Sequence, residues 1–171
     1  MGIQDLKERL TWFKKGSMTY QKPGSSAQVK TIEGTAAIDD AIEFLEDMDQ
    51  NQNYFPYKFG TPDLVKSARF HADWCSSSGG VSHDSPLTGT SEEWIRRVIK
   101  DAGEVAENIG VNLIDATGKD IILQLVIDDG VKTWDHRKNV FMQKGTHNAI
   151  GIADHAKFGL CVVLDYYENQ E

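Results

Sequence analysis

Three side chains with acid–base or metal-binding chemistry lie in separate turn-rich stretches of this sequence: His83, Glu107 and His136. Two imidazoles and a carboxylate can hold a borderline divalent cation such as zinc with one position open, or can poise a water molecule for general-base chemistry. Each residue taken singly also fits a plain role as a hydrogen-bonding loop side chain, and the spacing alone does not bring the three together. We take them as the candidate site, with His83 and His136 as the candidate metal ligands.

The stretch 127–141 concentrates further polar groups. It combines the expected end of a helix, a glycine turn and a cluster of His, Arg, Lys and Asn side chains at 136–139. A loop that presents an imidazole beside several hydrogen-bonding groups is where a binding site would be built. Asp128 and Asp129 add carboxylates, and Trp134 offers an aromatic wall for a ligand, with packing as the alternative. We include these three residues in the candidate ligand-binding cleft.

Helix signals flank the candidate residues. The Thr-Pro-Asp run at 61–63 combines a hydroxyl cap, a proline in the first turn and an early acid, which predicts a helix that ends at the serine run 76–78. Thr90 and Glu93 form a capping box for another helix. The sequence predicts helices over 35–47, from 61 to the serine run, over 90–103 and over 117–129.

Strands are predicted near the end of the chain. Residues 159–167 are β-branched, aromatic and continuous enough for a central strand, and 148–153 alternates weakly. The turn at 154–158 makes the two an antiparallel hairpin. Helices first and strands last indicate an α+β fold, in which helices cover both faces of a small antiparallel sheet. The three candidate residues then fall in separate loops.

Length and charge limit the classes of function. The chain has 171 residues and 40% hydrophobic content, which is enough to bury a full core and predicts a single main domain. Its net charge of −8 repels phosphate backbones and anionic lipid, so we expect no nucleic-acid partner. The longest apolar run, 121–127, is interrupted by Gln124 and is too short for a bilayer, so we expect no transmembrane segment.

The cysteines and the first residues predict a location. Cys75 and Cys161 permit at most one disulfide bond, and we expect two reduced thiols packed as small hydrophobic side chains. His71, one turn before Cys75, offers a thiol–base pair as the alternative, but no electropositive setting supports it. No leader-like apolar run is present near Met1. These features predict an intracellular, cytoplasmic protein.

Residues 1–34 are expected to form an N-terminal segment in front of a domain over 35–171. The stretch 1–17 is predicted to form a short amphipathic helix, whereas 16–34 has the composition of a linker or an extended arm. Ordering the backbone costs roughly 1–2 kcal/mol per residue, and this segment has few apolar side chains to offset that cost. We therefore expect a protein partner to order residues 1–34, and deletion of 1–30 to leave the domain folded.

The order of these motifs resembles the CAP superfamily, which includes cysteine-rich secretory proteins, antigen five and plant pathogenesis-related proteins. The family's first histidine, the acid of its Glu-Asn-Ile motif and its last histidine correspond to His83, Glu107 and His136. The resemblance runs from about residue 36 to residue 167. It implies a CAP-like α-β-α sandwich with a cleft lined by two histidines and two acids.

Departures from the family pattern bear on function. The second glutamate of the family corresponds here to a shorter acid, Asp128 or Asp129. Two glycines of the family are replaced by Asp135 and Ala106. With this incomplete tetrad, the resemblance implies a non-catalytic binding module or a folded component of a larger assembly. The cleft would bind zinc or another divalent cation weakly, or a small apolar or peptide ligand. The alternative is a metal-assisted hydrolase that uses His83, His136 and Glu107.

Overall fold

The structure, a computed structural model, describes residues 2–51, 56–112, 114–142 and 146–169. The chain divides into two compact units. Unit 1 comprises Met1–Tyr54 and Ile122–Val140, and unit 2 comprises Phe55–Ile121 and Phe141–Glu171.

Unit 2 is built on a four-stranded sheet in the order β3-β7-β8-β6. Its strands are β3 (Lys58–Phe59), β6 (Ala102–Asn112), β7 (His147–His155) and β8 (Gly159–Asn169). β7 and β8 form the predicted antiparallel hairpin, and β6 pairs antiparallel with β8. The expectation of a purely antiparallel sheet is corrected by β3, which pairs parallel with β7. This short strand leads directly into a helix that crosses the sheet, and such a crossover allows a parallel neighbour.

Strand β6 replaces a predicted loop. A helix was predicted to end at Gly103 and Glu107 was expected in a loop, whereas both residues lie in β6. The strand contains Gly, Ala, Glu and Asn residues of low β-propensity, so its local pattern is weak. Pairing with β8 over most of its length supplies the stability that local propensity lacks.

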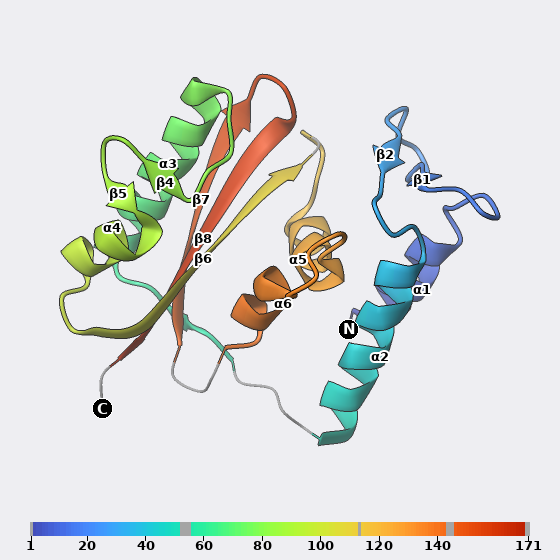
Figure 1. Ribbon diagram of the computed structural model, residues 1–171, viewed down its shortest axis with the longest axis horizontal. Helices are drawn as coiled ribbons and strands as arrows, with labels where there is room; N and C mark the ends of the chain where they lie inside the picture. Colours follow the sequence, from blue (N-terminus) through green and yellow to red (C-terminus); the bar gives the residue numbers. More distant parts are fainter. Residues whose placement is uncertain (1, 52–55, 113, 143–145, 170–171) are drawn as a thin grey trace. The chain divides into compact units, whose positions relative to one another are not determined.

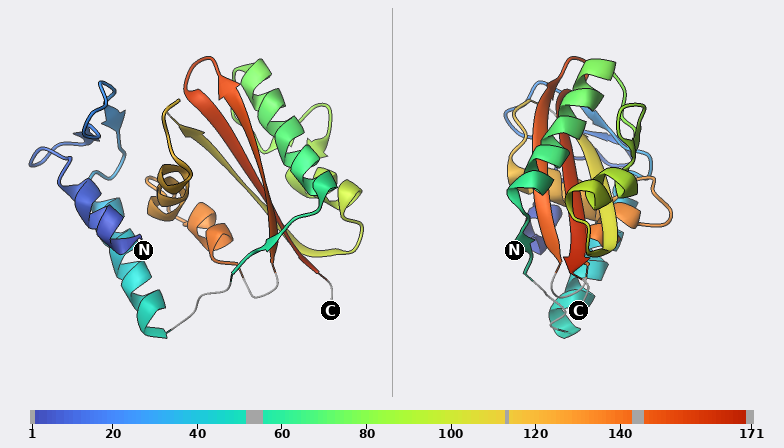
Figure 2. Two further views of the ribbon diagram at one scale, coloured as in Figure 1. Left: turned by 180° about the vertical axis from the view of Figure 1, so that it is seen from behind. Right: turned by 90° about the vertical axis from the view of Figure 1, so that its left-hand side faces the viewer.

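Two helices of unit 2 pack against the sheet. α3 (Pro62–Ser78) lies along β7 and β8, and α4 (Ser91–Val98) packs against β6 (Figure 1). Figure 2 shows α3 running along the strands in both views. Thr61 caps α3 by accepting a hydrogen bond from the backbone N–H of Leu64, and Thr90 and Glu93 form the predicted capping box of α4. The sequence signals for these two helix starts are therefore confirmed.

A glycine allows α3 to approach the sheet closely. A Cβ atom on Gly151 of β7 would overlap the backbone of Ala68 and Arg69 in α3. Between α3 and α4, the short strands β4 (Asp84–Ser85) and β5 (Gly89–Thr90) form a small hairpin. His83 lies immediately before β4, so the loop after α3 and this hairpin together set its position.

Unit 1 is mainly helical. Its elements are α1 (Ile3–Leu10), β1 (Thr19–Tyr20), β2 (Val29–Lys30), α2 (Ala36–Asn51), the part of α5 (Gly118–Ile127) from Ile122 onward, and α6 (Asp135–Val140). The predicted helices at 35–47 and 117–129 correspond to α2 and α5. His136 lies in α6 rather than in the predicted loop. Helix α1 is shorter than the predicted amphipathic stretch.

The N-terminal segment makes many contacts within unit 1. Leu6 of α1 is fully buried, and α1 packs against α2. β1 and β2 form an antiparallel pair, and the backbone N–H groups of Ile32 and Glu33 donate to the carboxylate of Asp129 at 2.7 and 2.8 Å. Residues in the range 2–34 therefore have contacts within the chain, and the protein partner expected for this segment stays a prediction. The boundary predicted after residue 34 stays a prediction.

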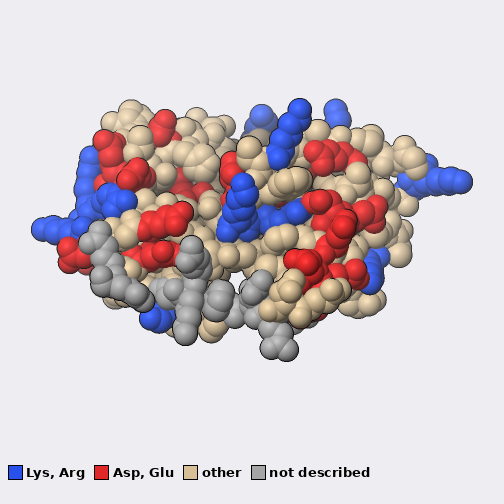
Figure 3. All heavy atoms as spheres, turned by 60° about the horizontal axis from the view of Figure 1, so that its bottom comes forward, with Lys and Arg blue, Asp and Glu red and all other residues tan. Residues whose placement is uncertain are grey.

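None of the helices in the described part of the chain has both the length and the apolar content of a membrane span. On the face drawn in Figure 3, acidic side chains gather in patches, and basic side chains lie between and around these patches. The α+β class predicted from the sequence is confirmed.

Candidate functional site

A buried carboxylate holds two imidazoles in unit 2. The Nδ1–H of His71 donates to Oε2 of Glu107 at 2.6 Å, and the Nδ1–H of His83 donates to Oε1 at 2.7 Å. The Glu107 side chain has no exposed surface, whereas the His83 side chain is 53% exposed. Glu107 holds His83 from the side that faces the core. The outer edge of this imidazole is therefore the part of the cluster that a ligand can reach.

Neighbouring strands bring a second acid beside Glu107. Glu107 of β6 stands opposite Asp165 of β8 in the strand register, and Asp165 is fully buried. Burial, followed by repulsion from the Glu107 carboxylate, raises the pKa of Asp165 well above its ordinary value. The neutral form of Asp165 is therefore favoured beside the Glu107 carboxylate.

Hydrogen bonding favours the protonated form of both imidazoles. Burial disfavours a charge on His71, but hydrogen bonds with Cys75 and Glu107 outweigh it and raise the pKa of His71 to about 9. The hydrogen bond to Glu107 also raises the pKa of His83, against the opposing effect of burial. At neutral pH His71 is thus an imidazolium, and the same carboxylate favours the protonated form of His83.

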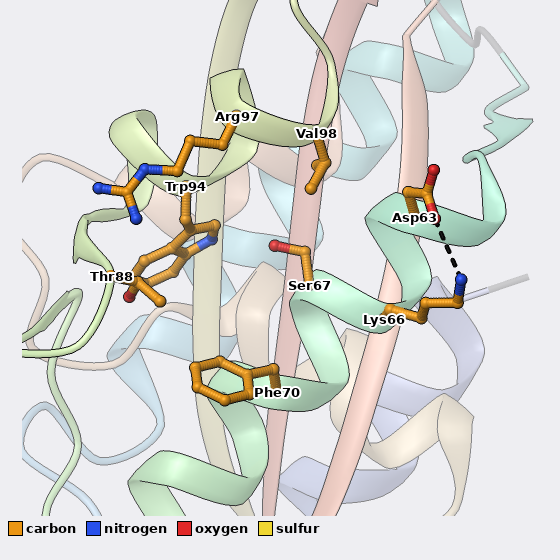
Figure 4. Close-up of a pocket in the computed structure, with 8 residues that line it drawn as sticks. All are labelled: Asp63, Lys66, Ser67, Phe70, Thr88, Trp94, Arg97 and Val98. Atoms are coloured by element: carbon orange, nitrogen blue, oxygen red, sulfur yellow. Dashed lines mark hydrogen bonds and ion pairs between the residues drawn. The ribbon is translucent and has the colours of Figure 1, made fainter.

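The cluster adjoins a shallow pocket between α3 and α4. This pocket has a volume of about 300 Å³, and its apolar lining includes Phe70, Trp94 and Val98 (Figure 4). Trp94 also packs edge-on against His71, with ring centroids 3.9 Å apart. The indole therefore forms the wall between the pocket and the buried cluster.

Unit 1 holds a second carboxylate–histidine pair. The Nδ1–H of His136 donates to Oδ1 of the buried Asp128 at 2.6 Å. Asp128 follows the last residue of α5 with a positive φ of 55°, a conformation that aspartate tolerates better than most residues. It also accepts the backbone N–H of Arg137 through Oδ2 at 3.1 Å. Asp128 thus fixes both the start of α6 and the orientation of His136.

Arg137 anchors this region from the interior of unit 1. Its guanidinium donates to the carbonyl groups of Val126 and Ile127 at the end of α5 and to Asp40 of α2. These carbonyl groups have no partner within the helix, so Arg137 satisfies them. The polar cluster at 136–139 was predicted to belong to a binding loop, and the structural role of Arg137 was not predicted. Arginine near an expected helix end was the available signal.

The other two cleft candidates have structural contacts. Asp129 accepts backbone N–H groups from Ile32 and Glu33. Trp134 is 45% exposed, and its ring lies 5.8 Å from the Arg137 guanidinium. Asp129 therefore fastens the N-terminal segment.

The predicted site residues divide between the two units. His83 and Glu107 meet in unit 2, as expected, and Asp128 meets His136 in unit 1. The convergence of His136 with His83 and Glu107 stays a prediction.

The described residues of unit 2 alone do not supply a suitable set of ligands for a metal ion. In neither unit do three or more His, Cys, Asp or Glu side chains among the described residues form a group that could hold a metal. Metals bind neutral imidazole, whereas the hydrogen bond with Glu107 favours protonated His83. Glu107 is enclosed and accepts two imidazole N–H groups. The zinc site predicted from His83 and His136 together stays a prediction.

Comparisons with known proteins define a fold class. No protein-family model and no curated protein sequence matches the chain. Solved structures do match, with an SCP domain among them, so the chain has an SCP-like fold of the CAP type.

Two of these structures are informative. An extracellular protein with an SCP domain from Bacillus anthracis is 16% identical, with a TM-score of 0.50 over 84% of this chain and 46% of that chain. An outer surface protein from Borrelia burgdorferi is 10% identical, with a TM-score of 0.52 over 82% of this chain and 98% of that chain. This chain thus spans less than half of the Bacillus protein. At these low identities, the structural similarity shows the fold alone.

The predicted intracellular location is contradicted by these comparisons. One similar structure is described as extracellular and the other as an outer surface protein. The prediction relied on two cysteines and on the residues near Met1, and neither feature sets the compartment. A domain with a large apolar core does not need a disulfide framework in order to fold outside the cell.

Proposed function

We propose that this chain is a non-catalytic SCP-like binding domain that works outside the cell or at its surface. The location rests on the extracellular and outer-surface descriptions of the similar structures. The ligand-binding group is His83, and the proposed ligand offers a hydrogen-bond acceptor, such as a peptide carbonyl. One observation carries this assignment: the exposed imidazole of His83 is held on its inner side by a hydrogen bond with the buried carboxylate of Glu107.

The geometry supports binding better than hydrolysis. A general base must reach the water molecule that it activates, but the Glu107 carboxylate has no exposed surface. His83 is the exposed member of the pair, and its raised pKa favours a proton donor over a base at neutral pH. A metal-assisted hydrolase would need Glu107 to leave both imidazoles, which would strand a buried charge.

A fixed donor also lowers the cost of binding. The ion pair with Glu107 restricts the His83 ring before a ligand arrives, so that less side-chain freedom is lost in the complex. The neighbouring pocket lined by Phe70 and Trp94 offers apolar surface on the same unit. A role in a larger assembly, through residues 1–34 or another surface, stays a prediction beside this one.

The test begins with selection of a phage-displayed random peptide library on the full chain. The selected peptides are then titrated calorimetrically and analysed by mass spectrometry after incubation. We expect peptides that bind wild type, lose at least tenfold in affinity for His83→Ala, keep their affinity for Lys157→Ala and remain uncleaved. Lys157 is an exposed residue of the same unit and does not line the pocket. Equal affinity for His83→Ala, or cleavage of the peptides, would overturn the proposal.

A further inference from the structure

Two cysteine thiols meet in the core of unit 2. Cys75 lies on α3 and Cys161 lies on β8, and both are fully buried in the same hydrophobic cluster. Their side chains are in hydrogen-bond contact, and both cysteines are free in this structure. Because α3 packs along β8, the contact follows from the fold itself rather than from a mobile loop.

We propose that Cys75 and Cys161 are a redox pair, which forms an intramolecular disulfide between α3 and β8 when the chain folds in an oxidising compartment. A disulfide bond is about 2.05 Å long, so the two sulfur atoms must move from contact to bonding distance by rotation of their side chains. The inference does not depend on the ligand proposed for His83. It gives a chemical role to the two cysteines, which the binding function leaves unused.

The environment activates one thiol of the pair. The hydrogen bond from Cys161 lowers the pKa of Cys75, and the hydrogen bond with His71 lowers it further. The contact with Cys75, together with burial, raises the pKa of Cys161. Thiolates rather than thiols attack disulfides, so Cys75 is the attacking sulfur and Cys161 is the resolving one.

The oxidant is a low-molecular-weight disulfide such as glutathione disulfide. The Cys75 thiolate attacks one sulfur of this molecule, which breaks its S–S bond and releases one glutathione thiolate. The Cys161 sulfur, after losing its proton to that thiolate or to solvent, attacks Cys75 in the mixed disulfide. This second step forms the Cys75–Cys161 bond and releases the second glutathione. Two cysteines are oxidised and one glutathione disulfide is reduced to two thiols.

Burial determines when the bond forms. Both cysteines have no exposed surface in the folded unit, so an external disulfide must react before α3 is fully packed or after it opens. In either state His71 lies one turn from Cys75 on α3 and still favours the thiolate of Cys75. We therefore expect rapid oxidation during refolding and slow oxidation of the folded, reduced chain. Once formed, the bond would remove the Cys75 thiol from His71, since His71 and Cys75 are hydrogen-bond partners in the reduced form.

The test refolds the full chain in a buffer of reduced and oxidised glutathione, then unfolds it in acid and alkylates it with N-ethylmaleimide. Intact-mass spectrometry should show a monomer lighter than the reduced chain by two hydrogen atoms and without maleimide. Its thermal midpoint should exceed that of the reduced chain by on the order of 10 °C. In NMR spectra, oxidation should shift the imidazole signals of His71 and leave those of His136 in place.

Cys75→Ala and Cys161→Ala provide matched controls, because neither variant can close the bond. If these variants fold poorly, the comparison of oxidised and reduced wild type still decides the question. Two maleimide groups on the monomer after equilibration with excess glutathione disulfide would overturn the proposal. A disulfide found between chains rather than within one chain would overturn it as well.

Discussion

Glu107 and Asp165 stand directly opposite each other on β6 and β8, and both side chains are buried. Two adjacent carboxyl groups cannot both ionise cheaply in a protein interior. His71 of α3 and His83 at the edge of the unit both pair with the Glu107 carboxylate. The exposed imidazole is therefore the outer end of a buried polar network.

The first prediction concerns the protonation of Asp165. Because burial favours the neutral form of this side chain, Asp165→Asn should change the free energy of unfolding by no more than about 1 kcal/mol, or should stabilise the protein. Urea unfolding at neutral pH measures this change, with the exposed Asp154→Asn as the matched control. A loss of more than about 3 kcal/mol would show that Asp165 is an ionised partner of a buried cation.

The second prediction is a pH dependence of stability. His71 has an ordinary pKa of 6.5 and a folded-state pKa of about 9, so the folded chain keeps a proton that the unfolded chain releases. The stabilisation is fully present below pH 6.5 and is lost as the pH rises through 9, with a total on the order of 3 kcal/mol. His71→Gln should flatten the profile across this window. An unchanged slope in that variant would assign the dependence to other groups.

Particular residues show how far the sequence predicts this structure. Thr61, Thr90 and Glu93 correctly predicted the starts of two helices, because capping depends on residues that are close in the sequence. Strand β6 was missed, because its stability comes from pairing with β8 rather than from its own residues. The same pairing explains why Asp165 was missed as the neighbour of Glu107.

His71 shows a second limit. It was recognised as a possible base for Cys75, but its bond to Glu107 joins α3 to β6 across the helix–sheet interface. No spacing rule links residues so far apart in the sequence. The order of motifs did predict that His83 would meet Glu107, because the resemblance supplied tertiary information that periodicity lacks.

The third prediction tests the close approach of α3 to the sheet. Gly151→Ala should destabilise unit 2 by at least about 3 kcal/mol, because the added methyl group would meet the backbone of Ala68 and Arg69. Gly80→Ala is the control, since nothing but the Ser78 hydroxyl comes within 4 Å of a Cβ built there. Thermal unfolding of both variants measures the difference. Similar midpoints would mean that α3 can move away without cost.

The fourth prediction concerns residues 1–34. Leu6→Ala should reduce the free energy of unfolding by about 2–5 kcal/mol, because Leu6 has no exposed surface in unit 1. Ile32→Ala, at a side chain that is 69% exposed, should have little effect. Urea unfolding of the isolated chain provides both values. A neutral Leu6→Ala variant would support the original expectation that a partner orders this segment.

The titration of His83 tests the central claim most directly. In the full chain, two-dimensional NMR of the imidazole nitrogens should give His83 a midpoint above its ordinary value of 6.5, with the proton on Nδ1 shared with Glu107. Glu107→Gln should return the midpoint toward 6.5, whereas Glu104→Gln, at an exposed position of the same strand, should leave it unchanged. A His83 that titrates at or below 6.5 in the wild-type chain would contradict the account of a donor fixed by a buried carboxylate.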